Sequence, residues 1–322
     1  MEVGLEANMP TYSGGLGVLA GDTLKAAADL SIPMVGVTLL HRKGYFRQYL
    51  DDQGHQNEKP FEWKPKNYLE PLTPLVTVLI EGRQVRIKAW HYRIKSPSGH
   101  HIHLYFLDSD VPGNTEWDRR LTDFLYGGDN RYRLCQETIL GMGGVAMLRA
   151  LGHDDIQVFH LNEGHSALLA LALLKERLNG SNLSDTRDED IDSIRRMCVF
   201  TTHTPIPAGH DKFPLDLVEK ILGKDSAEFL AATQAGQGGV LNLTSLALMF
   251  SWYVNGVSHQ HEKISQDMFP NYPINSITNG VTDSALKHLE STYFHDLPGT
   301  FGYQGLAKAS SAPRLFKACI YP

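Results

Sequence analysis

The feature that most constrains the fold is an alternation between short apolar runs and longer runs with helical spacing. Residues 15–30 repeat apolar side chains at helical spacing, and residues 32–40 follow as an apolar run typical of a buried strand. Further such segments lie at 130–151, 156–161, 165–178, 197–202, 214–222, 241–252, 254–257 and 274–278. This order predicts an α/β domain built on a largely parallel sheet with crossover helices. We interpret Met1–Leu5 as the end of a first strand, which completes a βαβ unit.

The stretch 70–108 has a different, hairpin-like pattern. Turn sequences around Gly82 and Gly99 separate β-prone runs at 75–80, 84–94 and 102–107. Short β-prone runs joined in this way are typical of antiparallel hairpins. We therefore expect an antiparallel region inserted into the α/β domain or placed beside it. Residues 179–192 are polar and are interpreted as a solvated linker.

Composition argues against several classes of function. Hydrophobic residues make up 42% and charged residues 20% of the chain, which is typical of globular proteins. The net charge is −6 without a block of like charges, whereas nucleic acids select basic surfaces. No apolar run approaches the roughly 20 residues that span a bilayer, and the first residues lack a secretory core. Three widely spaced cysteines are expected to be reduced core residues of a cytoplasmic protein.

A glycine-rich segment leads into the first helical run. It reads Ser13-Gly14-Gly15-Leu16-Gly17. Glycine lets backbone N–H groups approach an anion closely, and the first turn of a helix adds unpaired donors and a partial positive charge. The segment therefore favours a phosphate site, with a plain strand-to-helix turn as the structural alternative.

The same glycines loosely match a dinucleotide fingerprint, Gly15-x-Gly17-x-x-Ala20. A dinucleotide site also requires an acidic residue about 20 positions further on. No acidic residue occurs between Asp29 and Asp51. The pattern therefore disfavours a nicotinamide cofactor.

Two polar loops follow expected strands, where open α/β sheets bind their ligands. The first, His160-Leu161-Asn162-Glu163-Gly164-His165, has neither an i,i+4 histidine pair nor an HExxH array, so we favour a sugar contact over a metal site. The second, over 201–211, places His203 between hydroxyl groups. A neutral imidazole can hydrogen-bond a sugar hydroxyl, and the backbone carbonyl of the same residue can face a developing positive charge. Helix capping and a structural histidine are the respective alternatives.

Two Asn-Gly pairs complete the candidate set. Asn255-Gly256 and Asn279-Gly280 each follow a short apolar run. Such a pair alone usually marks an ordinary turn. The order of all these segments along the chain is more informative than any one of them.

Taken in that order, the segments resemble the N-terminal portion of the α-glucan phosphorylases, which act on glycogen, starch and maltodextrin. The likeness is strongest to the shorter microbial type and covers residues 1 to about 281. The motifs that carry it are Glu2-Val3-Gly4-Leu5, Tyr12-Ser13-Gly14-Gly15-Leu16-Gly17-Val18-Leu19-Ala20-Gly21-Asp22, Gly44-Tyr45-Phe46-Arg47-Gln48, Leu125-Tyr126-Gly127-Gly128-Asp129, Tyr132-Arg133-Leu134-Cys135-Gln136-Glu137, Asn162-Glu163-Gly164-His165-Ser166-Ala167, Thr202-His203-Thr204-Pro205 and Thr278-Asn279-Gly280-Val281.

The resemblance implies a Rossmann-like N-terminal domain of a glycosyltransferase-B fold over 1–281, with the hairpin region at about 70–108. It also implies cleavage of terminal α-1,4-glucosidic bonds by orthophosphate, with retention, to give α-D-glucose 1-phosphate. The family's cofactor is pyridoxal 5′-phosphate, whose phosphate acts as a proton relay while nearby oxygens stabilise an oxocarbenium-like sugar. Family members are often homo-oligomers.

Site residues follow from the same resemblance, motif by motif. Backbone amides of Gly15 and Leu16 hold the phosphate region, and the carbonyl of His203 faces the anomeric carbon, so these three are the expected catalytic residues. The expected substrate-binding residues are Gly14, Gly15, Leu16, Asn162, Glu163, His203 and Asn279.

The likeness ends at Val281, where Thr282-Asp283-Ser284-Ala285 departs from the family's continuation, and the family's chain normally extends upstream of Met1. We expect the second domain to be missing, with its Schiff-base lysine and its basic phosphate-binding residues. The chain is then expected to contain no cofactor-binding residue and to be inactive alone. Residues 282–322 are expected to form an atypical tail, either frameshifted or disordered.

Two other functions stay open. One is a non-catalytic glucan-binding module that uses the same cleft, and the other is a nucleotide-sugar glucan synthase of the same fold. Titration with maltoheptaose would test the first. The stretches 162–167 and 202–205 favour a phosphorylase over the second.

Overall fold

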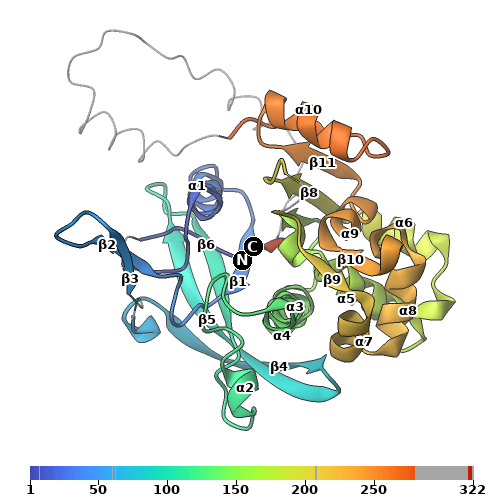
Figure 1. Cartoon of the computed structure of the whole chain (residues 1–322), viewed down its shortest axis with the longest axis horizontal. Helices are drawn as coiled ribbons and strands as arrows, with labels where there is room; N and C mark the ends of the chain where they lie inside the picture. The colour runs from blue at the N-terminus through green and yellow to red at the C-terminus, as the bar shows by residue number, and fades with distance from the viewer. Residues whose placement is uncertain (7, 60, 62, 207–208, 280–317, 321–322) are drawn as a thin grey trace.

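The computed structural model describes residues 1–279, apart from 7, 60, 62 and 207–208, together with the backbone of 318–320. Its main element is a nine-stranded sheet in the order β12-β11-β8-β7-β13-β1-β6-β5-β4 (Figure 1). These strands are β1 Val35–Leu39, β4 Glu70–Ile80, β5 Arg83–Lys95, β6 His101–Asp108, β7 Phe159–Asn162, β8 Cys198–Thr202, β11 Tyr253–Gly256, β12 Asn275–Ser276 and β13 Ala318–Ile320. Neighbours from β12 to β6 pair in parallel, whereas β6, β5 and β4 are antiparallel. The mixed α/β class agrees with the alternation in the sequence.

Helices pack on both faces of this sheet (Figure 1). The α-helices are α1 Gly15–Asp29, α2 Glu116–Arg119, α3 Asn130–Thr138, α4 Gly144–Ala150, α5 Leu168–Leu178, α6 Asp188–Arg195, α7 Leu215–Leu222, α8 Lys224–Ala232, α9 Leu243–Met249 and α10 His259–Met268. Short 3-10 or π turns are η1 Pro65–Asn67, η2 Ile139–Gly143, η3 Gly164–Ser166, η4 Leu183–Asp185 and η6 Gln234–Gly239. Two small antiparallel sheets join β2 Arg47–Leu50 to β3 Gln56–Lys59 and β9 Lys212–Pro214 to β10 Val240–Asn242.

The sheet separates two hydrophobic cores. Leu104 and Phe106 of β6 belong to the core that contains α1, whereas Tyr105 and Leu107 belong to the larger core that contains α3, α4 and α5. This division follows from the strand period of two, which sends successive side chains to opposite faces. All residues of β1 and β8 are buried, as expected for parallel strands covered on both faces.

The predicted first strand at Met1–Leu5 is wrong. The backbone N–H of Val3 donates to Thr11 O (2.9 Å), and that of Gly4 donates to Gly17 O (2.7 Å). These hydrogen bonds tie the segment to the glycine-rich loop and to α1, so it does not pair with a strand. The expected βαβ unit is therefore absent here.

The position beside β1 is taken instead by β13, between β7 and β1. The expected atypical tail over 282–322 is described only at these three residues and stays a prediction. The edges of β7 and β1 carry backbone groups that need partners, and β13 supplies them. The rest of that tail lies outside the described residues.

Two other predictions need correction. The helix over 130–151 is interrupted by the π turn η2. The linker over 179–192 includes the start of α6, where the side chain of Asp190 accepts a hydrogen bond from the Arg187 backbone N–H (3.1 Å). Acidic residues are favourable in the first turn of a helix, so this polar run caps a helix.

The prediction of antiparallel hairpins is confirmed, since residues 70–108 form β4, β5 and β6, which lie in the main sheet. Cys135 and Cys198 are free and buried. Across the part of the chain that the structure describes, every helix is too short or too polar to cross a membrane.

Glu81 joins the β4–β5 turn to α3, and it leads to a prediction about acid stability. Hydrogen bonds from Arg131 (2.7 Å) and Arg83 (2.8 Å) hold the pKa of this nearly buried carboxyl at about 2, below its ordinary 4.5. A depressed pKa stabilises the fold above pH 4.5, and this contribution is lost as the pH falls toward 2. Glu81→Gln should therefore lower the free energy of unfolding by about 1–2 kcal/mol at pH 7, with a smaller deficit at acidic pH.

Urea unfolding at several pH values measures this difference. Glu228→Gln is the matched control, because Glu228 forms an exposed ion pair with Lys224 on α8 (3.6 Å). The control should change stability by less than about 0.5 kcal/mol. A Glu81→Gln deficit that stays constant from pH 7 to pH 3 would contradict the assignment.

Candidate functional site

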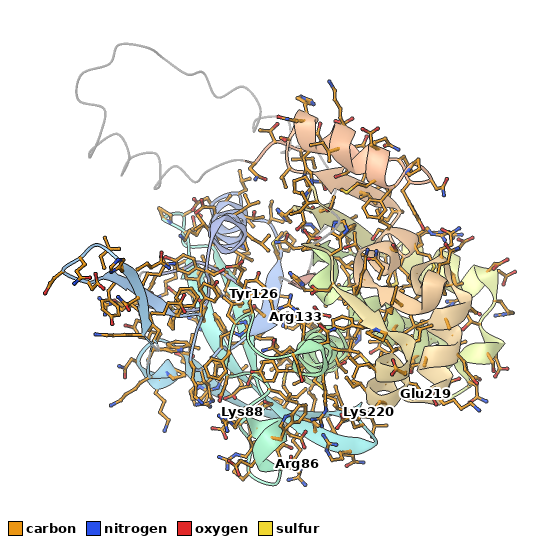
Figure 2. All side chains as sticks on the ribbon, viewed as in Figure 1. Arg86, Lys88, Tyr126, Arg133, Glu219 and Lys220 are labelled. Carbon is orange, nitrogen blue, oxygen red and sulfur yellow. The ribbon has the colours of Figure 1, made fainter. Side chains whose placement is uncertain are left out.

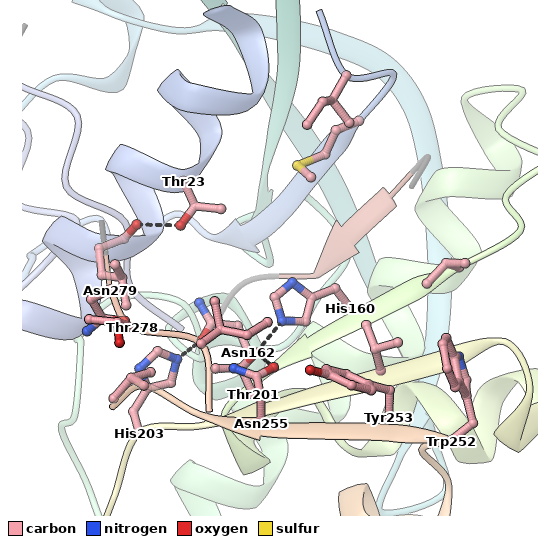
Figure 3. Close-up of a pocket in the computed structure, with 17 residues that line it drawn as sticks. Thr23, His160, Asn162, Thr201, His203, Trp252, Tyr253, Asn255, Thr278 and Asn279 are labelled. Atoms are coloured by element: carbon pink, nitrogen blue, oxygen red, sulfur yellow. Dashed lines mark hydrogen bonds between the residues drawn. The ribbon is translucent and has the colours of Figure 1, made fainter. Parts of the chain in front are cut away.

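A cavity of about 520 Å³ lies over one face of β7, β8 and β11 and reaches their carboxyl ends (Figure 3). Side chains of α1 form its opposite wall. It is lined by Leu19, Thr23, Ile32, Met34, Val158, His160, Asn162, Val199, Thr201, His203, Trp252, Tyr253, Asn255, Val257, Ile277, Thr278 and Asn279. The lining is mostly apolar, with a few polar groups at the strand ends, which is the usual character of a small-molecule site.

Three of the predicted substrate-binding residues meet in this cavity. Asn162 ends β7, His203 follows β8, and Asn279 follows β12. Parallel strands bring these positions to the same edge of the sheet. Gly280 and Val281 lie outside the described residues.

His203 is held on both its ring and its backbone. Its ring nitrogen Nε2 hydrogen-bonds the Asn162 side-chain oxygen Oδ1 (Figure 3), and its backbone N–H donates to Glu163 Oε2 (2.8 Å). Burial, reinforced by neighbouring histidines, lowers the pKa of His203 to about 3. The imidazole is therefore neutral at physiological pH, which is the form that can hydrogen-bond a sugar hydroxyl.

Glu163 does not line the cavity but supports the loop behind it. Its buried carboxylate accepts hydrogen bonds from the backbone N–H groups of His203 (2.8 Å) and Gly164 (3.1 Å) and from Thr204 Oγ1 (2.9 Å). Burial raises the pKa of Glu163, while these donors oppose the rise. The backbone φ of Glu163 is 69°, a strained value for a residue with a side chain. The structure thus places Glu163 as a brace between two loops.

His160 and His165 do not share a metal site. His160 Nε2 lies 2.8 Å from Thr201 Oγ1, which in turn donates to Asn255 Oδ1 (3.0 Å), so His160 is the donor in this chain of hydrogen bonds. Burial lowers the pKa of His160 to about 4. His165 lines a second cavity. The two rings therefore face different spaces.

Comparison with known proteins identifies related sequences along most of the chain. The chain is 39% identical to the maltodextrin phosphorylase of Thermococcus litoralis over 312 residues, which cover 90% of this chain and 36% of that protein. It is 35% identical to the glycogen phosphorylase of Mycobacterium tuberculosis, with 87% and 36% covered, and 30% identical to that of Aquifex aeolicus, with 87% and 42% covered. No family model matches the chain.

Over most of its length the chain is similar to glucan phosphorylases. It spans between about a third and about two-fifths of the length of these relatives.

The glycine-rich loop is held by Glu2, a residue that the sequence motifs did not single out as a site residue. Glu2 Oε2 accepts hydrogen bonds from the backbone N–H groups of Ser13 (2.6 Å) and Gly14 (3.3 Å). Its other oxygen accepts from Tyr126 OH (2.8 Å). The Gly14 amide is thus already engaged, which leaves the first-turn amides of Gly15 and Leu16 for an anion.

A second cavity of about 440 Å³ lies on the other side of the loops that hold Glu163. It is lined by Leu16, Tyr126, Gly127, Gly128, Asp129, Asn130, Arg133, His165, Thr204, Gly209 and Asp211. Leu16 of the predicted phosphate loop and Thr204, next to His203, meet here. The predicted site residues therefore do not share one cavity, since Asn162, His203 and Asn279 line the first and Leu16 lines the second.

Arg133 lies at the centre of a buried charged group in the second cavity, with Tyr126 close by (Figure 2). Its guanidinium contacts Asp211 Oδ2 (3.1 Å) and Glu137 Oε1 (3.1 Å), and His165 Nδ1 lies 2.7 Å from Asp211 Oδ2. Burial alone would raise the pKa of Asp211, but these hydrogen bonds lower it. Glu137, His165 and Asp211 could converge on a metal ion, yet Arg133 already supplies a positive charge among them.

The sequence predictions included Arg133 only within a longer motif, whereas they weighed His165 together with His160 as a candidate metal pair. The local signal for Arg133 was its i,i+4 spacing to Glu137 on one helix, which predicts an ion pair. No local signal pointed to Asp211 as the partner, because it lies 78 positions away from Arg133.

Proposed function

We propose that this chain supplies the sugar- and phosphate-facing part of an α-1,4-glucan phosphorylase with the glycosyltransferase-B fold. The proposed reaction is attack of orthophosphate on a terminal α-1,4-glucosidic bond to give α-D-glucose 1-phosphate with retention. The observation that carries this proposal is the meeting of Asn162, His203 and Asn279 in one cavity. The Rossmann-like domain over 1–281 and a cytoplasmic location are parts of the same proposal.

In this proposal the first cavity takes the terminal glucosyl unit. Amide oxygens and N–H groups of Asn162 and Asn279 bind sugar hydroxyls, and the neutral ring of His203 adds a further hydrogen bond. The backbone carbonyl of His203 faces the anomeric carbon, where it stabilises positive charge as the glycosidic bond breaks. The first-turn amides of Gly15 and Leu16 hold the phosphate, because they lack acceptors within the helix.

Pyridoxal 5′-phosphate is the cofactor expected for the family. The described residues that line the two cavities include no lysine, so these cavities do not fit a cofactor held as a lysine Schiff base. We therefore assign no cofactor-binding residue to this chain and route no chemical step through the cofactor.

The names of the relatives favour a phosphorylase over a nucleotide-sugar synthase. A glucan-binding role without catalysis would use the same first cavity. The proposed partners are α-1,4-glucan and orthophosphate or glucose 1-phosphate, while the oligomeric state is left open.

Calorimetric titration of the chain with maltoheptaose and with glucose 1-phosphate tests the site. We expect Asn162→Ala and Asn279→Ala each to weaken binding by about fivefold, the equivalent of one neutral hydrogen bond of about 1 kcal/mol. Asn182→Ala is the control, because Asn182 lines a different cavity. The absence of binding at millimolar ligand, or equal affinities for all variants, would argue against the proposed site.

A further inference from the structure

A group of histidines on the antiparallel side of the sheet plays no part in the proposed reaction. His91 of β5 lies opposite Tyr105 of β6, and His103 and His101 precede Tyr105 at alternate positions. Because side chains of directly opposed residues share a face and alternate along a strand, these rings all lie on one face of the sheet. None of them lines either cavity described above.

Two of these histidines are already close together. His91 Nε2 lies 2.8 Å from His103 Nδ1, and their rings are stacked with centroids 4.9 Å apart. Two nitrogens bound tetrahedrally to zinc at about 2.0–2.1 Å would lie about 3.3 Å apart. The pair therefore needs only a small separation to hold one ion. His101 lies edge-on to His103, with centroids 4.9 Å apart.

The surroundings of His91 also suit a metal ligand. Its second ring nitrogen, Nδ1, lies 3.6 Å from Glu70 Oε2 on the adjacent strand β4. A carboxylate beside the distal nitrogen is the usual partner of a metal-bound histidine, because it orients the ring and raises its basicity.

Two features oppose metal binding. Arg93 lies directly opposite His103 in the strand register and disfavours a second positive charge nearby. The three rings also do not converge on one point, so His101 has to rotate toward the other two. His101 is exposed, so this rotation meets little packing resistance. The carboxylate of Glu70 offsets part of the charge of Arg93.

We propose that His91, His103 and His101 form a binding site for a divalent transition-metal ion of the zinc class, which links β5 to β6. Zinc takes imidazole nitrogens readily, and a water molecule completes four-coordination. The site is independent of the proposed phosphorylase function and is structural in character. It would stabilise the antiparallel part of the sheet in proportion to metal occupancy.

The test is calorimetric titration of the metal-free chain with zinc chloride, followed by cobalt(II) absorption spectroscopy. We expect one zinc ion per chain and a cobalt spectrum typical of tetrahedral nitrogen ligation. His103→Asn should weaken zinc binding by more than about 100-fold, since even an outer partner of a ligand is worth about 10–100-fold. His101→Asn tests the third ligand in the same way and, being at an exposed position, should fold normally.

His259→Ala is the matched control, because the side chain of His259 is 86% exposed on α10. It should leave zinc binding unchanged. Binding that survives both His103→Asn and His101→Asn would place the ion elsewhere, such as at Glu137, His165 and Asp211, and would overturn the proposal. The absence of saturable binding at millimolar zinc would overturn it as well.

Discussion

Replacing Glu163 with alanine should lower the free energy of unfolding by about 3 kcal/mol, because it leaves one buried and two partly buried donors without an acceptor. Each unsatisfied donor costs about 1–3 kcal/mol, and relief of carboxylate burial offsets part of the sum. The donors are the backbone N–H groups of Gly164 and His203 and the hydroxyl of Thr204. Urea unfolding followed by circular dichroism measures the loss.

Glu163→Gln separates the role of the carboxylate from that of its shape. Glutamine keeps an oxygen at the position of Oε2, which still accepts hydrogen bonds from His203 and Thr204. At the position of Oε1 it places an N–H group, which cannot accept from the Gly164 N–H. One hydrogen bond is lost, so the expected cost is about 1 kcal/mol. Alanine and glutamine experience the same backbone strain at φ 69°, so the difference between the two variants reports the contacts of the side chain and not the strain.

The same pair of variants tests how Glu163 affects the site. If Glu163 positions the loop of His203, Glu163→Ala should lose maltoheptaose affinity, while Glu163→Gln should keep most of it. Equal stabilities and equal affinities for the two variants would contradict a bracing role.

Replacing Gly21 with alanine should destabilise the fold by more than about 3 kcal/mol, as expected for severe overpacking. A Cβ atom at Gly21 would lie 1.8 Å from Gly4 O. The segment cannot withdraw easily, because the Gly4 N–H donates to Gly17 O on the same helix (2.7 Å). Helix α1 would have to move away from the chain that it packs against.

Gly15→Ala is the matched control within the same motif. A Cβ atom at Gly15 would meet nothing within 4 Å, so stability should change by less than about 1 kcal/mol. Thermal unfolding of both variants checks the contrast. A similar loss of stability in Gly15→Ala and Gly21→Ala would contradict the prediction that only the closely packed Gly21 excludes a side chain. Reduced glucose 1-phosphate affinity in stable Gly15→Ala would support the proposed anion contact.

The meeting of three proposed site residues in one cavity was predictable because they follow parallel strands. In the sequence, each of Asn162, His203 and Asn279 follows an apolar run. This pattern alone predicts that the three residues lie at one edge of the sheet. The hairpin turns of 70–108 were equally local signals. Glu163 was predicted as a substrate contact, but its burial and its three donors give it a supporting position, which no local pattern could reveal.

By itself, the sequence determined the α/β class, the antiparallel hairpins and the strand-end loops, because periodicity and turn chemistry act over a few neighbouring residues. Only the tertiary structure decided that Glu2 holds the glycine-rich loop, that β13 lies between β7 and β1, and that three histidines gather on one face. Each of these depends on contacts across distant parts of the chain: Glu2 and Tyr126, for example, are 124 positions apart. Such pairings are selected by the burial and hydrogen-bonding needs of the whole fold, which local sequence patterns do not encode.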